Sequence, residues 1–204
     1  FKEKGGPRTF NFNLSEFLEV KEKDFLSTLE PVYKTIKKTR KKLDQNKSLI
    51  AFIGAPWTII IYLYNLKEKR NLDEKILIKN KDEIKLVIKK LEDFLKLHII
   101  KQKEAGAEII QIFDSWAGLI KEENLEEYCI NPNKNLVKFC KNNMIPAICF
   151  PKGLKNNYIR FINEVKPNAI NIDQDIDPLW AKNNFNGMCI QGGMDPKLLL
   201  ENEK

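Results

Sequence analysis

Five short apolar runs, each followed by a helical period, constrain the fold of this chain more than any other feature. Because a strand, a helix and a strand in strict alternation give parallel strands joined by right-handed crossovers, the sequence predicts an α/β fold. A chain of 204 residues can bury one sizeable core, and we expect a single domain over residues 1–204. The expected strands are residues 49–53, 109–113, 147–150, 169–172 and 188–191.

Helical periods fill the intervals between these runs. The clearest one has apolar residues at three- and four-residue steps between Ile84 and Ile99, and the Ala105-Gly106-Ala107 segment follows it. Other helices are expected near residues 29–43, 122–143, 154–165 and 177–184, with Asn131-Pro132 interrupting the one at 122–143.

The segments after the strands separate two possible architectures. No G-x-G-x-x-G pattern follows the first strand, as a dinucleotide-binding sheet would require. Each strand is instead followed by a different polar or glycine-containing loop, which is how a (β/α)8 TIM barrel builds its site. Five strands would leave two open edges, so we expect an incomplete barrel of about five parallel strands and an excerpt of a longer chain. The loops are residues 54–58, 114–118, 151–153, 173–175 and 192–196.

The net charge of +7 first suggests a nucleic-acid partner. Only four of the 35 basic residues are arginines, however, and the densest basic run, at residues 37–42, lies on the polar face of an expected helix. A solvated face is therefore favoured over a nucleic-acid patch, although a binding module for anions or RNA stays open as an alternative. Salt-titrated RNA binding would separate the two.

Membrane, metal and redox features are not expected. No apolar run approaches the ~20 residues of a membrane helix, and the opening Phe-Lys-Glu-Lys does not resemble a leader, so we expect a soluble, cytoplasmic protein. The four cysteines show no C-x-x-C spacing and no nearby histidine, which favours reduced thiols and no metal site. The single histidine, His98, falls on an apolar helical stripe and is expected to be a core residue.

Four ordered motifs resemble the uroporphyrinogen decarboxylase family. Residues 49–62 are similar to its G-F-x-G-A-P-W-T-x-x-x-Y segment, and residues 105–118 to its A-G-A-x-x-x-Q-x-F-(D/E)-S segment. Residues 150–153 resemble its F-x-K-G, and residues 190–196 its Q-G-N-L-D-P. The family fold is a (β/α)8 barrel, and the motifs would lie on its third to seventh strands.

The resemblance implies a lyase of porphyrin and heme biosynthesis. The family removes the four acetate carboxyls of uroporphyrinogen as CO2, without a cofactor, to give coproporphyrinogen. A homodimer is also implied. Protonation of the pyrrole α-carbon lets the ring itself accept the electron pair left by CO2, so no metal or prosthetic group is needed.

The same resemblance implies the site residues. Tyr62 would be catalytic and substrate-binding, because its hydroxyl can bind an acetate carboxylate or relay a proton. Ser115 would bind a substrate carboxylate, Phe113 would line the cleft floor, and Lys152 would hold a second carboxylate. Asp114 would be either a second acid or a residue that holds a neighbouring loop.

The sequence departs from the family pattern at several points. The family's R-Q-A-G-R-Y segment, the acidic residue after its second strand and its G-H-G segment have no counterpart here, and the 204-residue chain alone is expected to lack turnover. Gly193 replaces the usual asparagine, so an amide hydrogen bond is lost or replaced by a backbone one. Barrel methyltransferases of corrinoid and methylthiol metabolism are the alternative, but no cysteine here completes their His-x-Cys zinc pair.

Overall fold

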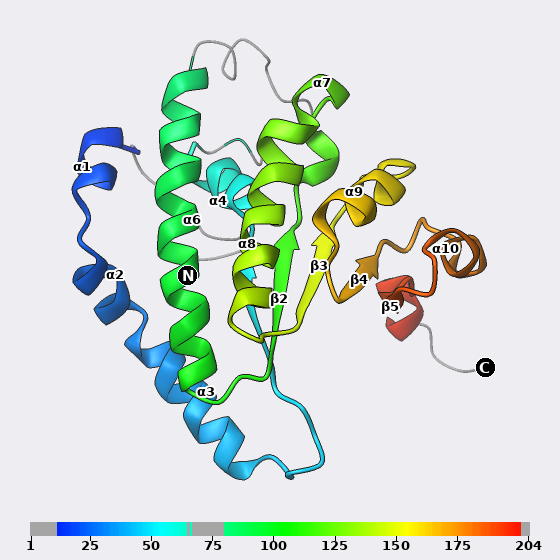
Figure 1. Ribbon diagram of the computed structural model, residues 1–204, viewed down its shortest axis with the longest axis horizontal. Helices are drawn as coiled ribbons and strands as arrows, with labels where there is room; N and C mark the ends of the chain where they lie inside the picture. The colour runs from blue at the N-terminus through cyan, green and yellow to red at the C-terminus, as the bar shows by residue number, and fades with distance from the viewer. Residues whose placement is uncertain (1–11, 65, 67–79, 201–204) are drawn as a thin grey trace.

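The computed structural model describes residues 12–64, 66 and 80–200 of the chain (Figure 1). Five parallel strands form one sheet in the order β1-β2-β3-β4-β5. The predicted α/β class and the five parallel strands are confirmed. The strands are β1 (Ile50–Gly54), β2 (Ile109–Asp114), β3 (Ala147–Pro151), β4 (Ala169–Ile172) and β5 (Cys189–Gly192).

Helical segments precede, connect and follow these strands. The α-helices are α1 (Leu14–Glu19), α2 (Glu22–Thr28), α3 (Glu30–Lys42), α4 (Pro56–Leu63), α6 (Lys81–Glu104), α7 (Glu122–Leu125), α8 (Asn131–Asn142), α9 (Asn157–Val165) and α10 (Pro178–Asn184). Two 3-10 turns, η2 (Ala117–Leu119) and η4 (Pro196–Leu200), and a π-helical turn, η3 (Glu126–Ile130), also lie in the described part of the chain. The interruption expected at Asn131-Pro132 therefore takes the form of a π turn directly before α8.

Strand order distinguishes this sheet from a doubly wound one. Consecutive strands are neighbours throughout, with no reversal of direction across the sheet, which is the arrangement of a segment of a (β/α)8 barrel. Crossovers of one hand that always advance in one direction place every connecting helix on the same face. The sheet consequently has one helix-covered face and one open face.

Burial along the strands shows which face is which. Ile53, Ile112 and Cys149 are buried in the same cluster as apolar residues of α6, α8 and α9, so they lie on the helix-covered face. Their neighbours in the strands point the other way, and Phe52 is 66% exposed. We call this second side of the sheet the open face.

A second core cluster joins α4, α6 and η3. The indole of Trp57 stacks on the ring of Tyr128 with ring centroids 5.4 Å apart, and Ile60, Ile84 and Val87 pack around them. Pro56 occupies the first turn of α4, where its missing N–H costs nothing, and it ends the extended β1 segment. This packing fixes the direction in which α4 leaves the sheet.

The single histidine lies where the sequence predicts. His98 of α6 is half-buried, and its Nδ1 atom is 3.0 Å from the hydroxyl of Tyr33 in α3. All four cysteines are free. No helix in the described ranges is both long and apolar enough to cross a membrane.

Candidate functional site

All five strands run in the same direction, so their carboxyl ends meet at one edge of the sheet. The five sequence-predicted loops begin at this edge, where parallel α/β folds place their binding residues. The prediction that the strand ends share an edge is confirmed. The functional roles of the residues there stay predictions.

Three phenylalanines form a row on the open face near this edge. The Phe113 ring centroid is 5.7 Å from that of Phe52 and 6.1 Å from that of Phe150, and both contacts are edge-to-face. Phe113 and Phe150 are register partners in β2 and β3, so their side chains leave the sheet on the same side. Phe113 is half-buried and lies on the open face, as the floor of a substrate cleft would.

Two glutamines add amide groups to the open face. Nε2 of Gln191 in β5 lies 3.4 Å from Oε1 of Gln111 in β2. Our sequence interpretation did not select either residue. The signal was available, because Gln111 is two positions before Phe113 and therefore shares its face.

Tyr62 lies close to the loop that carries Ser115. Tyr62 is half-buried on α4, and its ring meets that of Trp116 edge-on with centroids 6.4 Å apart. Nε1 of Trp57 donates a 3.0 Å hydrogen bond to the carbonyl of Trp116, which holds this loop against α4. Ser115 is half-buried in the turn that directly follows β2. The structure therefore brings Tyr62 and Ser115 to the same end of the sheet.

Asp114 faces the helices and not the open face. Its carboxylate accepts hydrogen bonds from the Thr58 hydroxyl at 2.9 Å and from the Asn133 amide at 3.0 Å. Asp114 is fully buried, and this burial raises the pKa of its carboxyl to about 6, while both hydrogen bonds act in the opposite direction. Of the two sequence alternatives, the contacts favour a residue that holds neighbouring segments, here α4 and α8, against the end of β2.

A second buried carboxylate positions the loop after β3. Oδ2 of Asp173 accepts hydrogen bonds from the Gly153 backbone N–H at 2.7 Å and from the Tyr158 hydroxyl at 2.9 Å. The side chain of Lys152, directly before Gly153, is exposed. Lys152 is thus an exposed cation on a fixed backbone at the carboxyl edge of the sheet.

The loops after β2 and β3 are in close backbone contact. A Cβ atom added at Gly118 would lie 2.8 Å from the Cα atom of Gly153, a distance that leaves no room for a side chain. The Gly118 N–H also donates a 2.8 Å hydrogen bond to the Lys152 carbonyl. Glycine at both positions therefore permits the two loops to dock.

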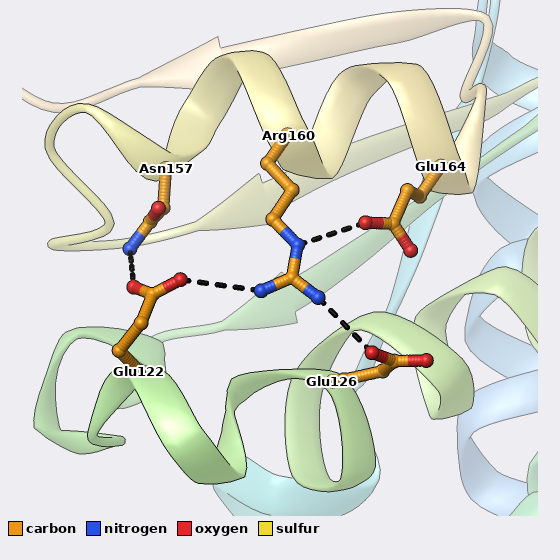
Figure 2. Close-up of polar contacts among 5 residues, drawn as sticks. All are labelled: Glu122, Glu126, Asn157, Arg160 and Glu164. Atoms are coloured by element: carbon orange, nitrogen blue, oxygen red, sulfur yellow. Dashed lines mark hydrogen bonds and ion pairs between the residues drawn. The ribbon is translucent and has the colours of Figure 1, made fainter.

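Arg160 joins the helices that follow these two loops. Its guanidinium contacts Glu122 at 3.2 Å, Glu126 at 3.1 Å and Glu164 at 2.8 Å, and Asn157 donates a further bond to Glu122 (Figure 2). Each contact is solvent-accessible and worth only ~0–1 kcal/mol. Together they connect the α7–η3 segment to α9 on the outside of the candidate site.

Gly193 follows β5 with a φ of +85°, which glycine and asparagine tolerate best. Its backbone N–H donates a 3.2 Å hydrogen bond to the Ile172 carbonyl. A residue of any type other than proline has this N–H, so the effect of glycine in place of asparagine stays a prediction.

Comparisons with known proteins identify what the chain resembles. The family model described as Uroporphyrinogen decarboxylase (URO-D) matches residues 1–204. The chain is 38% identical to a uroporphyrinogen decarboxylase of Rickettsia bellii (strain RML369-C) over 208 residues, which cover 100% of this chain and 61% of the relative. The corresponding protein of Rickettsia canadensis (strain McKiel) is 36% identical with the same coverage.

A uroporphyrinogen decarboxylase of Jannaschia sp. (strain CCS1) is 34% identical over 184 residues, which cover 87% of this chain and 53% of that relative. The chain therefore spans about three fifths or less of the length of these relatives.

Proposed function

Because this chain belongs to the uroporphyrinogen decarboxylase family, we propose that it supplies part of the site of a carboxy-lyase of porphyrin and heme biosynthesis. The proposed reaction removes the four acetate carboxyls of uroporphyrinogen as CO2 and yields coproporphyrinogen.

One observation carries this proposal beyond family membership. The open face ends in an aromatic row, and Tyr62 of α4 lies at the same edge as Ser115 and Lys152 of the loops after β2 and β3. A tetrapyrrole offers a broad apolar ring and anionic arms, which require an apolar floor with polar groups around it. The row of phenylalanines fits the first requirement, and Tyr62, Ser115 and Lys152 fit the second.

The proposed chemistry needs a proton donor and a place for an electron pair. Protonation of a pyrrole α-carbon makes the ring cationic, and cleavage of the bond to the acetate carboxyl then returns an electron pair to the ring as CO2 leaves. Protonation of the resulting exocyclic methylene gives a methyl group, and loss of a proton restores the pyrrole. This sequence uses no redox step and no prosthetic group.

Each site residue has a proposed part in these steps. The Tyr62 hydroxyl hydrogen-bonds the reacting acetate carboxylate or relays a proton. The Ser115 hydroxyl binds a neighbouring carboxylate. The exposed ammonium of Lys152 attracts a substrate arm. Phe113 supports the ring, since an aromatic side chain offers a flat apolar contact.

The methyltransferase alternative is not favoured. It would require a zinc-binding His-x-Cys pair, but His98 is hydrogen-bonded to Tyr33 and no cysteine stands two positions after it. In the ranges that the structure describes, no three His, Cys, Asp or Glu side chains form a group that could hold a metal ion.

We further propose a cytoplasmic homodimer, with family membership as the support. Sedimentation of the chimera described next would measure its mass. A monomer at micromolar concentration would contradict this part of the proposal.

A chimera tests the activity directly. Residues 1–204 replace the matching 208-residue region of the Rickettsia bellii relative, and coproporphyrinogen formation is followed anaerobically. We expect turnover by the chimera and none by the 204-residue chain alone. A folded chimera without turnover would contradict the proposed function, and turnover by the chain alone would contradict its expected dependence on other segments.

A further inference from the structure

Ser115, the proposed binder of a substrate carboxylate, lies in a segment that we call the Ser115 loop (residues 115–118). The first turn of α4 holds this loop from one side. The Thr58 hydroxyl donates a 2.9 Å hydrogen bond to Oδ1 of Asp114. Nε1 of Trp57 donates a 3.0 Å hydrogen bond to the carbonyl of Trp116. The two donors are consecutive residues of α4, and their acceptors directly precede and follow Ser115.

The loop after β3 holds the Ser115 loop from the other side. The Lys152 N–H donates a 3.1 Å hydrogen bond to the Asp114 carbonyl, and the Lys152 carbonyl accepts the 2.8 Å bond from the Gly118 N–H. Both bonds lie at the ends of the Ser115 loop. They fix where the loop begins and ends, and they leave its middle to another contact.

That contact is the hydrogen bond from Trp57. The Trp116 carbonyl lies in the middle of the Ser115 loop and accepts the Trp57 N–H as well as the Leu119 N–H, at 3.1 Å. The Leu119 bond is local, because its two residues are three positions apart in the chain. The Trp57 bond joins this carbonyl to α4 and therefore anchors the middle of the loop.

The Trp57 side chain is itself fixed in the core. It is 0% exposed, and its ring stacks on that of Tyr128 with an interplanar angle of 6°. Ile60 and Val87 belong to the same buried cluster. A buried N–H without an acceptor is unfavourable, so the indole has a physical reason to keep its bond to the loop. The donor is thus held in place by contacts that do not involve the loop it anchors.

Ser115 keeps its hydroxyl available while its neighbours are held. Its side chain is half-buried, and Oγ makes no hydrogen bond to any residue that the structure describes. A hydroxyl on a fixed backbone binds a carboxylate with a smaller loss of conformational entropy than a hydroxyl on a mobile loop. The anchoring bonds therefore favour ligand binding by Ser115 without using its hydroxyl.

We propose that Trp57 is a positioning residue for the substrate carboxylate that Ser115 binds. The Trp57 N–H holds the Trp116 carbonyl, and this sets where the adjacent Ser115 hydroxyl lies. Because Trp57 is fully buried, it acts through the loop and not by contact with the substrate. The inference rests on the proposed decarboxylase function, since the carboxylate belongs to the proposed substrate.

The test measures KM and kcat for uroporphyrinogen in the chimera. Trp57→Phe removes the N–H and keeps an aromatic ring to stack on Tyr128. We expect KM to rise about fivefold, as loss of one neutral hydrogen bond does, with kcat changed by less than about twofold. If Trp57→Phe does not fold, replacement of Trp57 by benzothienylalanine removes only the N–H, because sulfur takes the place of nitrogen in a ring system of similar shape. The same rise in KM is expected for this variant.

A double-variant cycle separates positioning from a general loss of packing. Ser115→Ala should also raise KM, by about fivefold or more, since it removes the hydroxyl itself. Because Trp57 acts through Ser115, adding Trp57→Phe to Ser115→Ala should raise KM no further. Tyr128→Phe is the control, since it changes the other ring of the stack and keeps the Trp57 N–H, and it should leave KM unchanged.

Several results in an active chimera would overturn this inference and leave the decarboxylase proposal standing. They are an unchanged KM for the Trp57 variants, a fall in kcat without a rise in KM, independent effects of Trp57→Phe and Ser115→Ala, and an equal rise in KM for Tyr128→Phe. A folded chimera without turnover would instead contradict the decarboxylase proposal, and this inference would fail with it.

Discussion

The hydroxyl of Thr58 donates a 2.9 Å hydrogen bond to Oδ1 of Asp114, and this bond joins the first turn of α4 to the last residue of β2. Tyr62 lies one helical turn further along α4, and Ser115 directly follows Asp114. The bond therefore sets the position of α4, which carries the Tyr62 hydroxyl, relative to the loop after β2, which carries the Ser115 hydroxyl.

The buried Asp114 should make stability depend on pH in an unusual direction. Its pKa is raised from 3.8 to about 6 in the folded state, so the native protein binds more protons than the unfolded chain between about pH 4 and 6. Its contribution to the free energy of unfolding is therefore lost as pH rises through this window, by at most ~3 kcal/mol. Urea unfolding at several pH values should show that Asp114→Asn removes this slope.

Thr58→Val provides the control for that measurement. It removes one hydrogen bond to the ionised carboxylate, which should raise the pKa of Asp114 further and extend the slope above pH 6. Identical pH profiles for the original chain and Asp114→Asn would show that this carboxyl does not titrate as we describe.

His98 should produce the opposite slope in an overlapping window. Burial lowers the pKa of its imidazole from 6.5 to about 4, so the unfolded chain binds more protons between those values. Stability from the neutral imidazole is present above pH 6.5 and is lost as pH falls toward 4. His98→Gln keeps an acceptor for Tyr33 and should flatten this acid-side loss in urea unfolding, whereas parallel curves would contradict the prediction.

Gly118→Ala should separate the loops after β2 and β3. The added Cβ would meet the Gly153 backbone at 2.8 Å, which cannot move as a side-chain tip can, so we expect a loss of about 1–3 kcal/mol in unfolding free energy. Gly54→Ala is the matched control, because its Cβ would meet side-chain atoms and no backbone, with Ile59 at 3.3 Å and Thr58 at 4.0 Å. Equal losses for the two variants would argue against a special loop contact.

The sequence predicts the strands and most helices because their apolar periods are strong. Which face of each strand is covered could not be predicted, because Ile50 to Ile53 are all apolar and burial does not alternate along β2. Helices α1 and α2 escape prediction for a physical reason. They are only six and seven residues long and neither buries a residue, so their apolar periods are too short to indicate a helix.

The buried polar contacts could not be predicted in the same way. The partners of Asp114 are Thr58 and Asn133, which lie 56 and 19 positions away in the sequence. Only the packing of α4 and α8 on β2 brings them together. The orientation of Asp114 toward the helices, which separates its two sequence interpretations, therefore requires the fold.

Lys152 should affect substrate capture more than turnover. In the chimera, Lys152→Gln should raise KM by about two- to fivefold with little change in kcat, because an exposed ammonium contributes ~1 kcal/mol or less to substrate binding. Lys155→Gln changes another exposed lysine of the same loop and serves as the control. An unchanged KM for Lys152→Gln would assign its side chain to the solvated surface.

The rate of coproporphyrinogen formation by the Tyr62→Phe chimera tests the central claim most directly. This change removes one hydroxyl and keeps the ring that contacts Trp116, so the protein should stay folded while kcat falls by ~10²-fold. Tyr64→Phe is the control, since the hydroxyl of Tyr64 bonds Glu83 and has no proposed part in the reaction. A large loss for Tyr62→Phe alone would support the site, and an unchanged kcat in a folded Tyr62→Phe chimera would contradict it.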